Sequence, residues 1–282
     1  MLASLRQERI LAAVHAHGAV RVAELVDELG VSDMTVRRDI TELAQAGLVR
    51  RVHGGAVALD ARARATDEPG FEAKQGWAAA EKAAIAAQAA RLIEPGQSIA
   101  LSAGTTTHLL AREIAADPAL RPLTVVTNSL PVAEALHGAG PGLDVILTGG
   151  ARTPSDALVG PVADHSLSRL RVDTAFLGVH GMDPDGLTTP NLLEAATDRA
   201  LVGCAARLTV LADHTKWGVV GLAQIAALDE VDVLVTDAGL PEPARRALAQ
   251  HVERLLLAPS AGSPDAAPSA PPPATPPAPG AP

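Results

Sequence analysis

Short aliphatic runs separated by alanine-rich helical stretches constrain the fold of this chain more than any other feature. Most of the runs are continuous rather than alternating in polarity, which is typical of strands buried on both faces of a parallel sheet. Strand and helix patterns that alternate in this way predict an α/β domain. The runs are SIALS (98–102), LTVVTN (123–128), LDVILTGG (143–150), TAFLGV (174–179), LTVLAD (208–213) and VDVLVTD (231–237).

Polar residues or glycines stand at the carboxyl ends of several runs. In open α/β sheets, ligands bind beyond the carboxyl ends of the strands. The sequence therefore predicts a ligand site at that edge of the sheet. The residues concerned are Ser102, Asn128, Gly149, Gly178, Asp213 and Asp237.

Composition divides the 282 residues into four parts. We expect a small helical domain with a hairpin over residues 1–58, a polar linker over 59–76 and the α/β domain over 77–257. Residues 258–282 are rich in Pro and Ala and are predicted to be disordered. Aromatic residues make up only 1% of the chain, which argues against a base-stacking platform for single-stranded nucleic acid.

The charge and cysteine content narrow the class of protein further. The single cysteine, Cys204, cannot form an intramolecular disulfide, and its apolar neighbours favour a buried side chain over a nucleophile. No stretch of about 18 residues is apolar and uncharged, and Arg6, Glu8 and Arg9 are unlike a signal peptide. We expect a cytoplasmic protein with no membrane partner. The net charge of −9 disfavours general polyanion binding but is compatible with a local basic patch.

The N-terminal part has the pattern of a helix-turn-helix. A helix over about 6–17 is followed by one over about 21–29, which stops at Gly30. Ser32 is expected to cap a third helix, whose apolar stripe is Val36, Ile40 and Leu43. Two helices joined by so short a break predict a helix-turn-helix, whose second helix enters the major groove of DNA.

Basic residues gather on the expected outer face of this module. Arginine pairs with guanine or with phosphate, and the segment LVRRVHGGAVAL after the third helix predicts a wing of two short strands. An ordinary solvated face, with Arg38 paired to Glu42 one helical turn on, is the alternative. The expected DNA contacts are Ser32, Met34, Thr35, Arg37, Arg38, Thr41, Arg50, Arg51 and His53.

The segment LSAGTTTHLLAREI predicts an anion site in the α/β domain. A buried strand ends, a Gly-Thr-Thr-Thr turn follows, and a helix begins. Backbone N–H groups at a helix N-terminus bind anions, which suits a phosphate, whereas the alternative is an ordinary helix cap. There is no Walker lysine and no Gly-x-Gly-x-x-Gly motif, and we expect no metal and no cofactor.

Together these motifs resemble the DeoR family of bacterial transcriptional repressors. In the N-terminal part the resemblance is carried by Arg6, Ile10, Val14, Ser32, the segment TVRRDI (35–40) and the wing GLVRRVHGGAV. In the α/β part it is carried by GTTTHLLA, VVTNSLPVAEAL, LTGG, LVGPVA, DTAFLGVHGMDPDGLTT and LADHTKWG. The resemblance covers about residues 3 to 250 and implies a winged helix-turn-helix joined to a sugar-phosphate sensor domain, related in fold to ribose-5-phosphate isomerases.

The same resemblance implies roles for individual residues. It assigns Gly104, Thr105, Thr106 and Thr107 to the phosphate of the effector. It makes Asn128, His180, Glu194 and Lys216 candidates for sugar hydroxyls or for the surroundings of the phosphate.

Two departures from the family patterns bear on function. The family usually carries an acid where this chain has Ser102, which is expected to affect sugar preference or affinity. The isomerases place acids in the loop that here reads GVHGMD and a lysine shortly after it, whereas here Asp183 is the only acid in the loop and PDGLTT has no lysine. Aldose–ketose isomerisation needs a positioned base and acid, so we expect binding without turnover and no catalytic residue.

The leading hypothesis is therefore a repressor of carbohydrate-metabolism genes. A homo-oligomer would bind a double-stranded DNA operator, and a phosphorylated sugar would release it through its different affinities for two states of the protein. One alternative is an enzyme of the sugar-phosphate isomerase type with a DNA-binding appendage. Another is a helix-turn-helix used only for protein contact, which predicts binding without the steep salt dependence of phosphate contacts.

Overall fold

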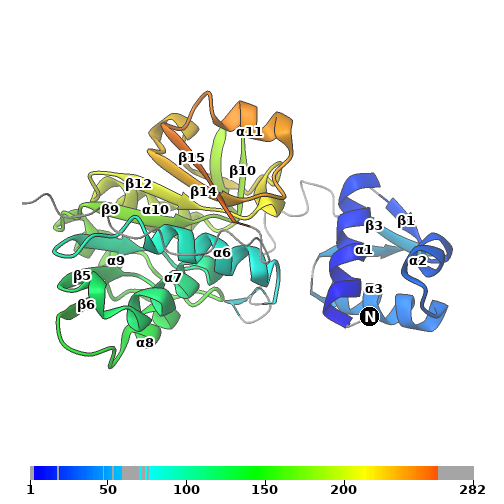
Figure 1. Cartoon of the computed structure of the whole chain (residues 1–282), viewed down its shortest axis with the longest axis horizontal. Coiled ribbons are helices and arrows are strands. Elements are labelled where there is room, and N and C mark those ends of the chain that lie inside the picture. Colours follow the sequence, from blue (N-terminus) through cyan, green and yellow to red (C-terminus); the bar gives the residue numbers. More distant parts are fainter. Residues whose placement is uncertain are drawn as a thin grey trace, which may run out of the picture.

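The computed structural model describes residues 3–17, 19–46, 48–52, 54–58, 70–71, 74 and 76–259. Their elements form an N-terminal group and a larger α/β group (Figure 1). Most of the predicted linker, and the predicted disordered tail after Pro259, lie outside the described residues. Among the described helices, none is both long enough and apolar enough to cross a membrane.

The N-terminal group is a winged helix-turn-helix, as predicted. Gly30 ends the first helix of the motif in the left-handed conformation at φ 65°, and the Ser32 hydroxyl accepts the Thr35 N–H at 3.3 Å to begin the second. The elements are α1 (Ala3–His17), β1 (Ala19–Arg21), α2 (Val22–Leu29), α3 (Asp33–Gln45), β2 (Val49–Val52) and β3 (Gly55–Ala58).

The wing differs from the predicted hairpin by one strand. The short strand β1 pairs antiparallel with β3, with Ala19 opposite Val57, so the sheet has three strands in the order β1-β3-β2. Three residues directly beside a helix give no alternation that a sequence pattern can detect. The extra strand ties the wing to the start of α2.

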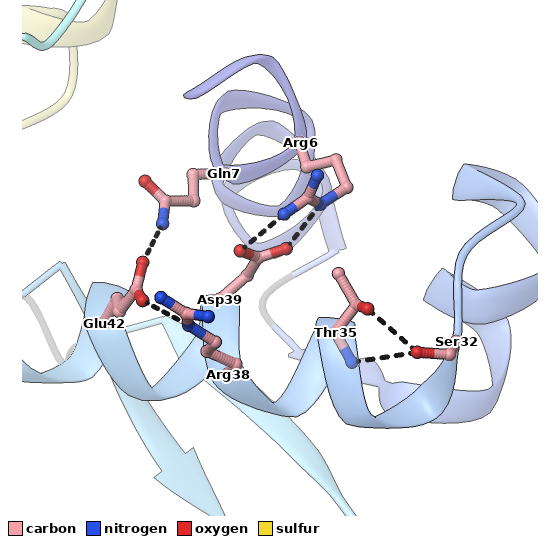
Figure 2. Close-up of polar contacts among 7 residues, drawn as sticks. All are labelled: Arg6, Gln7, Ser32, Thr35, Arg38, Asp39 and Glu42. Atoms are coloured by element: carbon pink, nitrogen blue, oxygen red, sulfur yellow. Dashed lines mark hydrogen bonds and ion pairs between the residues drawn. The ribbon is translucent and has the colours of Figure 1, made fainter. Parts of the chain in front are cut away.

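An ion pair joins α1 to α3 inside the N-terminal group. Asp39 is buried, with its side chain only 2% exposed, and it accepts hydrogen bonds from Nε of Arg6 at 2.7 Å and from Nη2 at 3.1 Å (Figure 2). The predicted stripe of Val36, Ile40 and Leu43 is buried beside it. Two parallel hydrogen bonds fix both the position and the orientation of a guanidinium, so this pair sets how α3 is held.

The α/β group is built on a parallel sheet with the order β15-β14-β12-β9-β4-β5-β6. The six predicted runs become the strands β4 (Ser98–Leu101), β5 (Leu123–Thr127), β6 (Leu143–Leu147), β9 (Thr174–Gly178), β12 (Leu208–Leu211) and β14 (Val233–Asp237). The seventh strand, β15 (Arg254–Ala258), was not predicted, and it reaches into the start of the expected tail. The edge strand β6 also departs from the prediction of burial on both faces, because Val145, Ile146 and Leu147 are exposed.

Helices cover both faces of this sheet. One core joins Ile85, Leu110 and Val132 of α6, α7 and α8 to strand residues such as Ile99, and the other joins helices α9, α10 and α11 to the alternate residues. This arrangement explains the continuous apolar runs, since both faces of the strands are packed. The helices are α6 (Ala79–Ala90), α7 (Thr105–Ala116), α8 (Leu130–Leu136), α9 (Pro161–Ser168), α10 (Leu192–Gly203) and α11 (Glu242–Leu248).

Smaller elements surround the carboxyl edge of the sheet. A three-stranded antiparallel sheet contains β10 (Gly181–Asp183), β11 (Gly186–Thr189) and β13 (Ala223–Ala226), and β7 (Ala151–Arg152) pairs with β8 (Leu158–Val159). A Cβ on Gly181 would lie 2.0 Å from the carbonyl oxygen of Val219, so only glycine allows the loops to approach this closely. The short 3₁₀ helices are η1 (Pro118–Leu120), η2 (His214–Lys216) and η3 (Leu228–Glu230).

Replacing Arg6 tests the ion pair with Asp39. Arg6→Met leaves a buried carboxylate without its cation, so we expect the thermal unfolding midpoint of the N-terminal domain to fall by about 10 °C or more. Far-UV circular dichroism measures this transition, and tryptophan fluorescence follows the α/β domain separately because Trp77 and Trp217 are the only tryptophans. Arg38→Met is the matched control, since its ion pair is exposed. Equal effects of the two substitutions would contradict the role of the buried pair.

Candidate DNA interface and effector site

The second helix of the motif presents its predicted residues on the side away from the core. Met34 is 77% exposed and the side chain of Arg38 is 80% exposed. Nε of Arg38 donates to Glu42 at 2.9 Å, as the one-turn spacing predicts, and Gln7 of α1 donates to the other oxygen of Glu42 at 2.6 Å (Figure 2). The hydrogen bond from Arg38 lowers the pKa of Glu42, which keeps this carboxylate ionised.

A second line of contacts links α3 to the wing. Arg37 donates from Nε and Nη2 to the two carboxylate oxygens of Asp33. The Thr41 hydroxyl donates to the backbone carbonyl of Arg37 at 2.7 Å and accepts from Nη1 of Arg51 at 3.2 Å. Exposed ion pairs of this kind are weak, so both arginines of α3 can exchange their carboxylate partners for phosphates or bases.

The structure brings seven of the nine predicted DNA contacts to α3, its cap and the wing. Ser32 and Thr35 are engaged with each other, with 2.8 Å between their hydroxyl oxygens (Figure 2). Arg50 lies on β2, but its side chain and the whole of His53 lie outside the described residues. The seven are Ser32, Met34, Thr35, Arg37, Arg38, Thr41 and Arg51.

A cavity lies at the carboxyl end of the sheet, and it is lined by residues of the α/β group and also by residues of α1 and α3 such as Gln7 and Glu42. The turn before α7 lies at its wall, so the N-terminus of that helix is available to an anion. Most of the predicted effector contacts share this cavity: Gly104, Thr105, Thr106, His180, Glu194 and Lys216 all line it.

Two predicted effector residues are placed differently. Thr107 is buried and donates to the carbonyl of Gly104 at 3.0 Å. Asn128 is also buried, accepting the Ala103 N–H at 3.1 Å and donating to the carbonyl of Leu158 at 3.2 Å. Neither is among the residues that line the cavity, so their side chains hold the shape of the turn before α7.

Ser102, the departure from the family pattern, is likewise not among the residues that line the cavity. Its hydroxyl is buried and accepts the Gly178 N–H at 2.9 Å, which joins the end of β4 to the end of β9. An acid at this position would be placed beside the same backbone group. Ser102 therefore influences the cavity through the strand ends.

Glu194 is held at the start of α10 by hydrogen bonds to its Oε1 oxygen. That oxygen, Oε1, accepts from the hydroxyls of Thr153 at 2.6 Å and Ser155 at 2.8 Å. Asn191 caps the helix by accepting the N–H groups of Leu193 and Glu194. The two hydroxyl residues were not predicted, because they lie about 40 residues away in the chain. A buried carboxylate fixed in this way is suited to accepting hydrogen bonds from sugar hydroxyls.

Lys82 is a cavity residue that the sequence analysis missed. It lies on α6, is only 2% exposed, and donates from Nζ to the carbonyl of Lys74 at 3.0 Å. Burial, together with the nearby Lys216, lowers the pKa of Lys82 to about 8, against an opposing effect of Asp213. Its position offered a signal, since Lys82 falls on the apolar stripe of its helix with Ile85, Ala86 and Ala89.

A histidine–carboxylate pair adjoins the two lysines. Nδ1 of His214, which lines the cavity, lies 2.8 Å from Oδ2 of Asp237. This hydrogen bond raises the pKa of His214 in spite of burial. Burial alone would raise the pKa of Asp237, but the hydrogen bonds from His214 and Gly239 outweigh it and lower the pKa. The pair therefore favours a positively charged imidazole at the cavity.

The one acid in the loop GVHGMD supports the fold of the loop and does not face the cavity. Asp183, the acid in the loop GVHGMD, accepts the N–H groups of Asp185 at 3.0 Å and Gly186 at 3.2 Å. It thus closes the β10–β11 turn and is not among the residues that line the cavity. Within the described ranges, no group of three or more His, Cys, Asp or Glu side chains could hold a metal ion.

Replacing the buried lysine by an apolar residue of similar length tests its charge. The folded protein binds fewer protons than the unfolded chain between pH 8, the pKa of Lys82, and pH 10.5, its ordinary value. The charged ammonium group of Lys82 thus lowers the free energy of unfolding below pH 8, by roughly 3 kcal/mol. This penalty disappears as the pH rises toward 10.5.

We therefore expect Lys82→Met to stabilise the ligand-free α/β domain at pH 7 and to have progressively less effect from pH 8 upward. Urea unfolding followed by tryptophan fluorescence measures both quantities. Arg91→Met, at the exposed C-terminal end of the same helix, is the control. A stability gain that does not change with pH would contradict a buried charged lysine.

Comparison with known proteins identifies both groups of elements. Residues 6–62 match the DeoR-like helix-turn-helix domain, and residues 77–238 match the DeoR C terminal sensor domain. The HTH-type transcriptional regulator YgbI of Escherichia coli K12 is 37% identical over 254 residues, covering 90% of this chain and 97% of the relative. GlpR of Haloferax volcanii, another HTH-type transcriptional regulator, is 37% identical over 247 residues, covering 87% and 94%.

The lactose phosphotransferase system repressor of Staphylococcus aureus is 35% identical over 237 residues, covering 82% of this chain and 91% of the relative. Among solved structures, ribose 5-phosphate isomerase A from Methanocaldococcus jannaschii is 17% identical, with a TM-score of 0.35 over 48% of this chain and 53% of the isomerase. The family matches confirm the prediction of a regulator rather than an enzyme. The chain belongs to the DeoR family and is a DNA-binding transcriptional regulator.

Proposed function

We propose that the protein represses carbohydrate-metabolism genes and leaves its double-stranded DNA operator when a phosphorylated sugar binds the sensor domain. The observation that carries this proposal is the cavity, which combines the N-terminus of α7 with Lys82 and Lys216 at its wall. The similarity to a repressor named for the lactose phosphotransferase system supports the same class of regulated genes.

The two kinds of group in the cavity suit the two ends of a sugar phosphate. The backbone N–H groups of Thr105 and Thr106 at the start of α7, together with the two ammonium groups, attract a phosphate. Glu194, with Oε1 fixed by two hydroxyls, accepts hydrogen bonds from a sugar. His180 also lines the cavity and adds a ring that can bind a hydroxyl.

Lys82 offers a physical reason why a phosphate bound in the cavity would change the stability of one conformation of the protein. An ammonium group taken out of water is unfavourable until an anion compensates its charge. A bound phosphate supplies that charge, so the conformation that holds the anion is stabilised relative to others. Differential affinity of this kind is what an effector needs in order to change DNA binding.

We further propose that the protein acts in the cytoplasm as a homo-oligomer. Helix-turn-helix proteins bind two half-sites with two copies of the recognition helix, because one half-site gives little affinity and specificity. A dimer or a tetramer would meet this requirement.

Arginine substitutions test the DNA interface. We expect Arg37→Ala and Arg38→Ala each to weaken binding to the chain's own upstream DNA by roughly ten-fold or more, without loss of folding. Fluorescence anisotropy at two salt concentrations measures the affinity and its salt dependence. Arg246→Ala, at an exposed position of α11, is the control and should bind normally. Unchanged affinity in both α3 variants would refute the assignment of the recognition helix.

The effector response tests the cavity in the same assay. We expect one member of a panel of phosphorylated sugars to release the DNA, while its unphosphorylated counterpart does not. Lys216→Ala and Thr106→Val should bind DNA as before but lose this response, because the first removes an ammonium group from the anion site and the second removes a hydroxyl donor at the start of α7. Thr124→Val, on β5 and away from the residues that line the cavity, is the control. Normal release in both cavity variants would count against the site.

A further inference from the structure

Met34 is the most exposed of the large apolar side chains in the described part of the chain, at 77%. It is the second residue of α3, at the end of the recognition helix that leads into the major groove. Its side chain contributes nothing to the core of the N-terminal group. Met34 is therefore available for contact with a binding partner on the outer face of α3.

Helix geometry places Met34 and Arg38 together. Successive residues turn by about 100°, so Met34 and Arg38, two positions before and after the buried Val36, each lie about 160° from it. Both point almost directly away from the core. Arg37 is only about 100° from Val36 and so lies on the flank of the helix. The exposures agree, since the side chain of Arg38 is 80% exposed and that of Arg37 is 45% exposed.

Arg37 is also more fully hydrogen-bonded within the protein than Arg38. Asp33 holds both Nε and Nη2 of Arg37. Arg38 binds Glu42 through Nε alone, and within the described residues its terminal nitrogens Nη1 and Nη2 make no hydrogen bond. That free pair of nitrogens is a donor edge that can bind O6 and N7 of guanine.

We propose that Met34 and Arg38 read neighbouring bases of the operator: Met34 packs on the C5-methyl group of a thymine, and Arg38 binds a guanine. This inference rests on the proposed DNA interface. Thymine is the only base of unmodified DNA that presents an apolar group in the major groove, and burying the exposed thioether against it removes apolar surface from water. Arg37, held on the flank by Asp33, contacts the phosphate backbone.

The spacing of the two side chains limits the arrangement of the bases. Residues one turn apart on a helix have Cβ atoms about 5–6 Å from each other, and bases along one strand are separated by about 3.4 Å. The thymine and the guanine are therefore one or two base pairs apart in each half-site.

Single-atom changes in the DNA test this assignment. The full-length protein is first used to select its operator from a library of random double-stranded DNA. Each thymine of the selected sequence is then replaced by deoxyuridine, which lacks only the methyl group. We expect one thymine per half-site at which this change weakens binding of the unmodified protein by about four-fold. Met34→Ala should lose a similar factor on the thymine operator and be indifferent to deoxyuridine there.

Matched variants separate the roles. Replacing the guanine by 7-deazaguanine, which lacks the N7 acceptor, should weaken the unmodified protein but not Arg38→Ala. Arg37→Ala should bind all sequences more weakly and lower the salt slope by about one. Leu5→Ala, an exposed apolar position on α1, is the control and should keep the full sensitivity to deoxyuridine.

The possible failures are distinguishable. A selected operator whose affinity ignores every thymine methyl, or a sensitivity that persists in Met34→Ala, overturns the role of Met34 and leaves the DNA interface standing. Sensitivity to 7-deazaguanine that persists in Arg38→Ala overturns the role of Arg38. A library from which no sequence is enriched overturns the proposed DNA interface, and the base contacts with it.

Discussion

A parallel sheet has to be covered on both faces, and the rest of the sensor domain follows from this constraint. Helices α6, α7 and α8 pack on one face and α9, α10 and α11 on the other. Because the strands are parallel, the chain has to cross back to the same end of the sheet before each new strand begins. The carboxyl ends of the strands, and the loops that follow them, are therefore collected along one edge. Residues that are remote in sequence therefore come together at this edge. The turn before α7, the start of α10 and the 3₁₀ helix η2 all line the cavity there.

Within that cavity the most costly feature is a buried charge. Lys82 takes the place of an apolar residue on α6, and its only hydrogen-bond acceptor among the described residues is a backbone carbonyl. Proteins tolerate such groups where binding uses them, since a buried cation attracts an anion more strongly than an exposed one does. The neighbouring Lys216 adds to the unfavourable charge, and the pair His214–Asp237 favours a further positive group. The proposed anionic effector would supply a partner for these cationic groups.

The DNA-binding domain solves the opposite problem, because a chain with a net charge of −9 has to approach a polyanion. Three of its acids pair with arginines of the domain: Asp39 is buried with Arg6, whereas Asp33 and Glu42 pair with Arg37 and Arg38 at the surface. The buried pair is structural, whereas the exposed pairs are weak and can be exchanged for contacts with DNA. The same residue types thus stabilise the fold on one face of α3 and lie on the proposed recognition surface on the other (Figure 2).

The sequence by itself determined the three helices of the N-terminal domain, six of the seven strands of the parallel sheet, and the order of the two domains. These features depend on periodicity and capping over a few residues, as Val36, Ile40 and the cap at Ser32 illustrate. Only the tertiary structure decided which side chains meet over long separations: Arg6 with Asp39, Glu194 with Thr153 and Ser155, and Lys82 with the site of Lys216. It also showed that the side chains of Thr107 and Asn128 support the turn before α7 rather than line the cavity, and it added the strands β1 and β15. The physical reason is that local patterns state which face of an element is buried, whereas the partner that covers it is fixed by packing of the whole chain.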